Sequence, residues 1–283
     1  MEYLLRKEVI LVEILVKSKS FRDDDAFNIF GIEGLSLYEN TISISEVSSY
    51  RNIYVSIDRN LFNDDLPFLE EVLLKLKDSN VLGIFFYDMA VLSMSKKLGV
   101  DIPLIWNQDF LVTNSRTCKF YEKLGISGIV ISSLVTVSEI LNISKNTNLK
   151  VFLNIFGYQL ISASKRKFIS CYGTFANKDY DKCNYMSERG VRYPIVENKW
   201  GSLIYSNLPL NGIKYIDRFK TTIDGVILSD FLIDEEVFSK VYSIFKSAIK
   251  DGDYSFEDKI DDMIASDTYF FDKETIYKVK RND

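Results

Sequence analysis

Short apolar runs rich in β-branched and aromatic residues recur along the chain, and many are separated by stretches with apolar residues every three or four positions. Continuous short apolar runs predict strands that are covered on both faces, as in a parallel sheet. The predicted strands are Val9–Val16, Phe27–Ile32, Ile53–Ile57, Val81–Tyr87, Pro103–Trp106, Gly128–Ile131, Lys150–Phe156 and Gly225–Ser229. Eight strands are the number that closes a (β/α)8 barrel.

The amphipathic stretches predict helices that pack one apolar face against such a barrel. These helices are Leu66–Lys77, Met89–Leu98, Asn114–Leu124, Val137–Ile143 and Glu235–Ile249.

Two places break the alternation of strand and helix. Only Lys17–Ala26 separates the first two strands, which is too short for a full crossover helix, so the first βα unit is expected to be truncated. A long insert, from about Gly157 to Asn211, separates the seventh and eighth strands, and such inserts are commonly functional loops or docking surfaces. The aromatic, acidic tail 251–283 is expected to pack across the barrel through Tyr269–Phe271. We therefore predict one α/β domain over 1–283, a TIM-like barrel with a long insert.

The composition narrows the chemistry, because the 283 residues include no histidine. This excludes Ser–His and Cys–His nucleophile pairs and imidazole metal ligands. The net charge of −5 argues against a broad, non-specific nucleic-acid surface, although a local basic patch is compatible with it. Three widely spaced cysteines, with no secretory signal before them, favour reduced thiols in the cytoplasm. The apolar run near the N-terminus contains Glu13 and is interpreted as a strand, so we expect a soluble protein without a membrane segment.

Polar residues at the C-terminal ends of the predicted strands are the candidates for a site, since barrel enzymes place their chemistry there. Asp88 follows the fourth strand and Asp109 the fifth, and either carboxylate could act as an acid or base. For Asp88 the alternative is a cap for the helix that begins at Met89. Asp58 could form a ligand-facing ion pair with Arg59, or the two could be an exposed loop pair.

Amide and basic side chains complete the candidates for ligand binding. Asn107 and Gln108 lie beside Trp106 and suit a polar or planar ligand better than bond cleavage. Asn154 interrupts an apolar strand, where it would either face a ligand or be a satisfied buried amide. Lys165 and Arg166, in a basic run, could hold a phosphate backbone.

Several segments resemble the collagenase-like peptidase family U32. The similarity lies in Asn63-Asp64, in Tyr87-Asp88, in Ile102–Ser115, in Tyr121–Gly125, and in the ending Thr275–Val279. The resemblance implies a TIM-like barrel. It also implies one of the family's activities, which are peptidase-like cleavage, oxygen-independent hydroxylation of ubiquinone precursors, and hydroxylation of tRNA or ribosomal RNA. Some members work as pairs of unequal paralogues.

The departures from the family pattern concentrate at the predicted barrel rim. Phe62 and, at the end of the fifth strand, about Ile105 stand where the family carries histidines. Ser133 and Leu134 stand where it has an Arg-Glu pair, and Ile227–Phe231 replaces its Lys-x-Glu-Gly-Arg ending. Because this chain lacks both the charged side chains and the histidines that the family carries at the barrel rim, the sequence argues against retained catalysis.

In some members of the family a cysteine-rich segment after the seventh strand ligates an iron–sulfur cluster. In this chain Lys167 and Ser187 occupy two of the ligand positions, Cys183 is in register, and Cys171 could substitute only after a local shift. A cluster normally takes four thiolates, so the sequence favours no resident cofactor. RNA modification by an iron–sulfur centre in this chain, with Cys171 and Cys183 among its ligands, is the disfavoured alternative.

Taken with the resemblance, these losses predict an accessory or weakly catalytic protein. It would bind a ligand or partner a catalytic paralogue, in RNA modification for example, with RNA or peptide as the substrate. The alternative is an active peptidase without histidine. That enzyme would use a carboxylate-activated water at Asp88 and Asp109, or Cys171 or Cys183 as the nucleophile.

Overall fold

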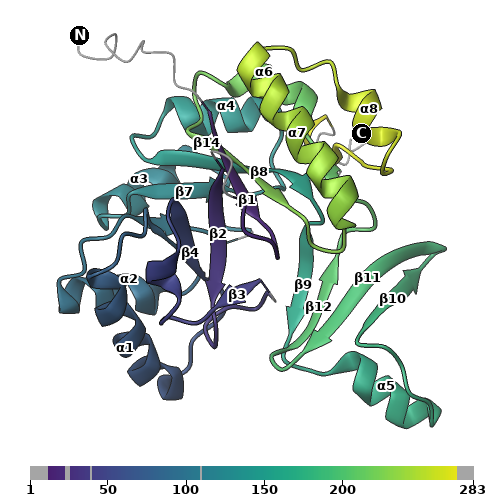
Figure 1. Cartoon of the computed structure of the whole chain (residues 1–283), viewed down its shortest axis with the longest axis horizontal. Helices are drawn as coiled ribbons and strands as arrows, with labels where there is room; N and C mark the ends of the chain where they lie inside the picture. Colours follow the sequence, from purple (N-terminus) through teal and green to yellow (C-terminus); the bar gives the residue numbers. More distant parts are fainter. Residues whose placement is uncertain (1–11, 23–25, 39, 109, 273–283) are drawn as a thin grey trace, which may run out of the picture.

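The computed structural model describes residues 12–22, 26–38, 40–108 and 110–272, and in it eight parallel strands form a closed barrel (Figure 1). Each strand pairs with its two neighbours, and the pairings of β1 with β14 and with β2 close the ring. In ring order the strands are β1 (Glu13–Lys17), β2 (Phe27–Ile32), β4 (Ile53–Ile57), β5 (Ile84–Phe86), β6 (Leu104–Trp106), β7 (Gly128–Ile131), β8 (Lys150–Gly157) and β14 (Gly225–Ser229). The TIM-like barrel is confirmed, and each predicted strand overlaps an observed one, although residues 9–11 of the predicted first strand lie outside the described residues.

The barrel interior is filled by one apolar or aromatic side chain from each of the eight strands. The rings of Tyr54, Phe85 and Phe152 meet edge to face, with centroids 5.4 to 6.4 Å apart. The whole layer is Leu15, Ile29, Tyr54, Phe85, Ile105, Val130, Phe152 and Ile227. Because this layer is packed solid, a ligand can reach only the ends of the barrel.

Five helices on the outside of the barrel match the predicted ones, with differences of one or two residues at their ends. The apolar stripe of the first, Leu69, Val72, Leu73 and Leu76, is fully buried, as the periodicity predicts. The helices are α1 (Leu66–Lys77), α2 (Met89–Leu98), α3 (Ser115–Lys123), α4 (Val137–Lys145) and α7 (Glu235–Asp251).

The first two connections of the barrel lack a full helix. In the described residues between β1 and β2 no helix forms. The next connection contains the short strand β3 (Thr41–Ile42) and the 3-10 turn η1 (Val47–Ser49), which the sequence analysis did not anticipate. Residues 41–45 alternate polar and apolar side chains, a period of two that favours extended backbone over helix.

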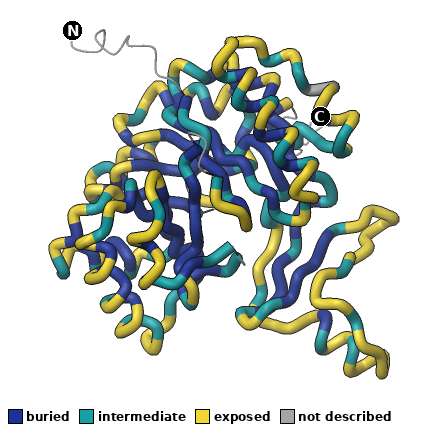
Figure 2. Tube along the Cα trace, in the orientation of Figure 1, coloured by how far each residue is buried: buried dark blue, intermediate teal, exposed yellow. Residues whose placement is uncertain are grey.

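Residues 157–211, here called the insert arm, contain a separate four-stranded antiparallel sheet that projects from the barrel (Figure 1), while the ends of the range belong to the barrel sheet. Its base packs on the barrel mouth, where Val196, Leu203 and Tyr205 are buried against Leu37 and Phe231. Its outer part is largely exposed (Figure 2). In sheet order the strands are β10 (Cys183–Glu188), β11 (Val191–Asn198), β12 (Gly201–Tyr205) and β9 (Leu160–Ser164), and α5 (Phe168–Ala176) follows β9.

The described part of the C-terminal tail packs against residues 207–219. Tyr269 donates a hydrogen bond to the Leu208 carbonyl at 2.8 Å, and the Phe271 ring lies 5.2 Å from that of Tyr215. The segment Thr275–Val279 lies outside the described residues. The smaller elements are η2 (Asn63–Asp65), β13 (Leu210–Asn211), η3 (Ile213–Tyr215), α6 (Ile216–Phe219), α8 (Glu257–Asp261) and η4 (Tyr269–Phe271). None of the helices in the described segments is both long and apolar enough to span a membrane.

Candidate functional site at the barrel mouth

A layer of mostly polar residues lies above the apolar layer, at the C-terminal end of the barrel. Strand side chains alternate between two faces, so the residue two positions after each interior residue also faces inward. Seven of these eight positions hold polar residues, and the eighth is Gly31. The polar ones are Lys17, Ser56, Tyr87, Asn107, Ser132, Asn154 and Ser229. Ile105 itself belongs to the interior layer, so the rim position of β6 is Asn107 rather than Ile105.

Two amides in this layer are available to a ligand. Neither Asn107 nor Asn154 has a side-chain hydrogen-bond partner within the described part of the chain, although Asn107 is only 9% exposed. The interpretation of Asn154 as a satisfied buried amide is therefore wrong. Gln108 is already engaged, since it donates to the Tyr87 hydroxyl at 2.8 Å and accepts from the Phe110 amide at 3.2 Å. Asp109 lies outside the described residues.

The carboxylate of Asp58 is fully committed to hydrogen bonds inside the protein. It accepts from the hydroxyls of Ser36 and Ser56, both at 2.7 Å, and from the Leu37 amide at 2.9 Å. The prediction of an exposed Asp58–Arg59 pair is wrong, because both residues are buried and Arg59 instead pairs with Asp65. Asp65 lies six residues after Arg59 in the same connection between β4 and α1, so the pair is local in sequence, but its geometry follows only from the fold of that loop.

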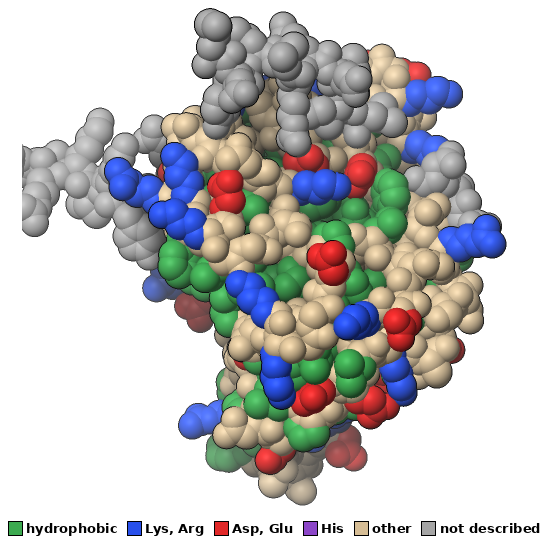
Figure 3. Space-filling view, turned by 90° about the vertical axis from the view of Figure 1, so that its left-hand side faces the viewer, with side chains coloured by type: hydrophobic (Ala, Val, Ile, Leu, Met, Phe, Trp, Pro, Cys, Tyr) green, Lys and Arg blue, Asp and Glu red, His purple; other side chains and the backbone are tan. Residues whose placement is uncertain are grey.

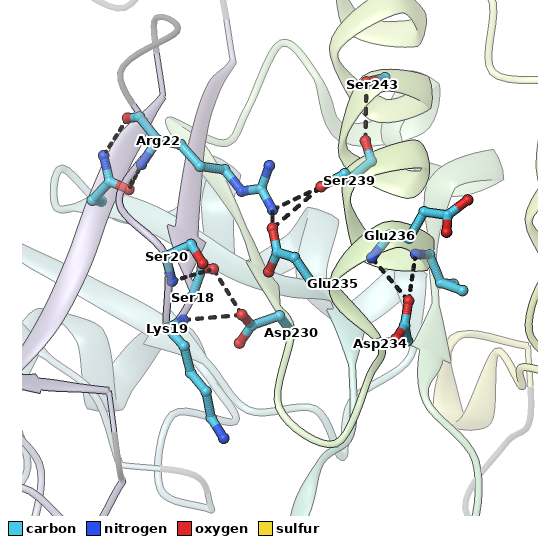
Figure 4. A network of polar contacts seen from close by, with 12 residues as sticks. Ser18, Lys19, Ser20, Arg22, Asp230, Asp234, Glu235, Glu236, Ser239 and Ser243 are labelled. Carbon is cyan, nitrogen blue, oxygen red and sulfur yellow. Dashed lines mark hydrogen bonds and ion pairs between the residues drawn. The ribbon is translucent and has the colours of Figure 1, made fainter.

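Asp88 and Asp230 are also occupied. Asp88 caps α2 by accepting from the Ala90 amide at 2.9 Å, as the capping alternative predicts, and it also accepts from the Leu61 amide at 3.0 Å. Asp230 accepts from the Ser18 hydroxyl at 2.7 Å and the Lys19 amide at 3.0 Å, which ties the end of β1 to the end of β14 (Figure 4). These carboxylates fasten the barrel rim.

A cavity of about 130 Å³ lies between the rim and the base of the insert arm, and we call it the rim pocket. The guanidinium of Arg59 forms one wall: it makes a two-pronged pair with Asp65 at 2.9 and 2.6 Å and lies 4.1 Å from the Trp200 ring centroid. Hydrogen bonds from Arg59 hold the pKa of Asp65 below its usual value. The lining residues are Leu37, Arg59, Asn60, Phe62, Tyr87, Ala163, Ser164, Lys165, Trp200 and Leu203.

Lys165 supplies the available positive charge of the rim pocket. Its ammonium lies 3.2 Å from the centroid of the Phe62 ring, and within the described segments it makes no hydrogen bond or close ion pair, although its charge helps to lower the pKa of Asp65. The charge of Arg59, in contrast, is balanced by Asp65. Phe62, which stands where the resemblance places a histidine, thus serves as an aromatic floor beneath a cation. The predicted ligand-binding residue Lys165 lies in this pocket, whereas Arg166 does not line it.

A second cavity, of about 330 Å³, lies on another side of the arm's base. It is lined by aliphatic, aromatic and uncharged polar side chains. Ser133 and Leu134, which replace the family's Arg-Glu pair, are among them. The lining residues are Phe110, Ser133, Leu134, Gln159, Leu160, Ile161, Tyr193, Ser206, Asn207, Leu210, Tyr269 and Phe270.

The two cysteines of the insert arm do not match an iron–sulfur ligand set. Cys171 lies on α5 and Cys183 begins β10, and both are exposed. Among the described residues no three His, Cys, Asp or Glu side chains gather in a way that could hold a metal ion. A [4Fe–4S] cluster takes four thiolates, and the whole chain has three cysteines, of which Cys118 is buried on α3. The residues present therefore do not fit a cluster.

Sequence reasoning missed Trp200 as a pocket wall, and it placed Arg59 near a ligand only as the partner of Asp58. The available signal was that Trp200 is one of only two tryptophans and lies in a polar segment of the insert, Asn198–Gly201. Its contact with Arg59 could not be predicted, because about 140 positions separate the two residues in the sequence.

Comparisons with known proteins give the same family as the residue pattern. A sequence profile described as peptidase family U32 matches residues 40–272. The chain is 27% identical over 253 residues to the tRNA hydroxylation protein P2 of Bacillus subtilis, covering 80% of this chain and 81% of that protein. It is 21% identical over 131 residues to the tRNA hydroxylation protein P1 of the same organism, covering 46% and 31%.

Among solved structures, 2,3-dimethylmalate lyase aligns over 92% of both chains with a TM-score of 0.41 and 9% identity. The barrel assignment rests on the strand pairings described above.

Proposed function

Since this chain belongs to peptidase family U32, we propose that it is a cytoplasmic tRNA-modification protein that contributes to tRNA hydroxylation as the accessory partner of a catalytic paralogue. The observation that carries the proposal is the rim pocket, where the ammonium of Lys165 lies over the Phe62 ring and where Trp200 and Tyr87 also line the wall.

The chemistry of the rim pocket suits a nucleotide. An ammonium attracts a phosphate, and an aromatic ring stacks on a base; of the rings in this pocket Phe62 is exposed, and Trp200 and Tyr87 are half-buried. The cavity of about 130 Å³ is smaller than the roughly 300–1,000 Å³ typical of drug-sized ligand sites, so it favours a single ring or phosphate group. Asn107 and Asn154, whose side chains have no hydrogen-bond partner among the described residues, add donors and acceptors at the barrel mouth.

The accessory role is supported by the state of the rim carboxylates. Asp58, Asp88 and Asp230 each accept hydrogen bonds from backbone amides, and there is no histidine to take or give a proton. The relatives named P1 and P2 occur together in one organism, which supports the idea that two unequal proteins share the task.

The proposal is tested by the binding of unmodified tRNA to the purified full chain, measured by filter binding. Lys165→Glu should weaken binding about tenfold, because it removes a phosphate contact and adds repulsion. Lys97→Glu on α2 is the matched control, since Lys97 is 69% exposed and makes only a 3.9 Å ion pair with Glu70. Equal loss in both variants, or in neither, would count against a specific RNA site at the rim pocket.

A companion assay addresses the peptidase alternative. We expect no cleavage of gelatin by the purified chain. Cleavage that is present in the wild type and absent in Asp88→Asn would replace the accessory role with hydrolysis.

A further inference from the structure

The insert arm carries a charge opposite to that of the rest of the chain. Residues 157–211 contain eight Lys or Arg and four Asp or Glu, a formal charge of +4. Since the whole chain carries −5, the remaining residues carry −9. On the face of the molecule in Figure 3, acidic and basic side chains are interspersed. The arm is thus the positively charged part of an acidic protein.

The end of the arm exposes a cluster of aromatic rings, here called the tip cluster, made of Tyr172, Phe175, Lys178 and Tyr180. Phe175 is 87% exposed and Tyr172 is 58% exposed. The Tyr172 ring lies 5.5 Å from that of Tyr180 and 6.4 Å from that of Phe175. The Lys178 ammonium lies 5.2 Å from the Tyr180 ring centroid.

The tip cluster is held by a fixed scaffold. Glu197 on β11 accepts from the Ser170 amide and from the Lys182 ammonium, both at 3.0 Å, and from the Ser170 hydroxyl. Lys182 also donates to the Ser170 hydroxyl at 2.6 Å. These contacts fasten the first turn of α5 to the sheet, while on α5 only Ile169 is buried. The helix is therefore anchored at one end and presents its aromatic rings to solvent.

Large aromatic side chains left this exposed on a rigid element are a feature of binding surfaces. Bases of an unpaired strand stack on such rings, and nearby cations track the phosphate backbone. We propose that the tip cluster binds a single-stranded segment of RNA, with bases stacked on Tyr172 and Phe175 and the backbone near Lys178. This deepens the proposed function, on which it rests, by naming a second surface for the same RNA.

The charge of the arm favours RNA over a protein partner as the occupant. The +4 belongs to the arm as a whole, and Lys165-Arg166-Lys167 directly before α5 complements a polyanion, whereas at the tip Asp179 and Asp181 closely follow Lys178. Charged residues, Lys178, Asp179 and Asp181, lie next to the aromatic rings of the tip cluster in the sequence. The centre of an obligate protein interface is depleted of charged residues, so the tip cluster does not resemble one.

The experiment measures fluorescence anisotropy of a labelled oligouridine of about 12 nucleotides, a length within the range that single-strand binding folds cover. The full chain is compared with the double variant Tyr172→Ala, Phe175→Ala. The matched control is Phe120→Ala on α3, because Phe120 is also 58% exposed and lies outside the arm. Affinity should fall about tenfold or more in the double variant and stay unchanged in the control. Phe175→Trp should retain the affinity.

Three outcomes would overturn the inference. The first is unchanged oligouridine binding in the double variant. The second is equal loss in Phe120→Ala, and the third is equal loss of binding to a blunt RNA duplex of the same length, whose bases cannot stack on the protein. If oligouridine binding is unchanged but co-elution with the paralogous protein is lost, the tip cluster docks protein instead. The Lys165→Glu variant separates the two proposals. If Lys165→Glu weakens tRNA binding while the Tyr172→Ala, Phe175→Ala double variant binds RNA as well as wild type, only this inference fails and the proposed function stands.

Discussion

The guanidinium of Arg59 lies 4.1 Å from the centroid of the Trp200 ring, so a residue of the barrel rim and a residue of the insert arm form adjoining walls of one pocket. Arg59 is fixed by Asp65 and by the carbonyls of Gly34 and Asn60, at 2.9 and 3.0 Å. The position of the arm on the barrel therefore determines the shape of the rim pocket.

Trp200→Ala should both loosen the arm and weaken tRNA binding. Removing the ring loses a partly buried cation–π contact, which lowers the free energy of unfolding by about 1–2 kcal/mol. Trp200→Phe should retain most of the stability, because an aromatic face remains over Arg59. Urea unfolding measures the first effect and filter binding the second. Full tRNA affinity in Trp200→Ala would show that this wall takes no part in binding.

Asp58 and Asp88 should differ in how much stability they provide. Asp58→Ala leaves two buried hydroxyls and a backbone amide without their acceptor, and we expect a loss of about 3 kcal/mol. Asp88→Ala removes a helix cap and should cost about 1 kcal/mol. Chemical denaturation of both variants tests whether Asp58→Ala loses more free energy of unfolding than Asp88→Ala. A larger loss in Asp88→Ala would contradict the structural role given to Asp58.

The stability of the insert arm should depend on pH through Glu197. Burial by itself raises the pKa of this carboxyl, but hydrogen bonds from Ser170 and Lys182 outweigh it and hold the pKa at about 2, below the ordinary 4.5. A carboxyl with a lowered folded-state pKa contributes stability that is complete above its unfolded value and is lost as the pH falls toward the folded value. Wild type should therefore exceed Glu197→Gln in stability near pH 7.

This advantage should shrink between about pH 4.5 and about pH 2. Hydrogen exchange at the amides of α5, which Glu197 anchors through Ser170, reports the effect locally. A difference between wild type and Glu197→Gln that does not change over this range would rule out Glu197 as the titrating group.

The barrel was predictable from sequence because its strands and helices carry strong, regular apolar patterns. The five residues of β4, for instance, are all buried, and the stripe of α1 follows the helical period. The sheet of the insert arm was not predicted, because β9 and β10 expose most of their residues and so lack a buried face to mark them. Lys165 could be proposed from its basic run, whereas its partner Phe62 could not, since the arm brings the two together only in the fold.

The central claim is that the rim pocket serves tRNA hydroxylation. It is tested most directly by mass spectrometry of nucleosides from tRNA of the native host, with its own gene deleted and replaced by wild type, Lys165→Glu or Lys97→Glu. We predict that hydroxylated nucleosides fall on deletion, return with wild type and with Lys97→Glu, and stay low with Lys165→Glu at equal protein level. Unchanged hydroxylation in the deletion strain, or full restoration by Lys165→Glu, would contradict the account.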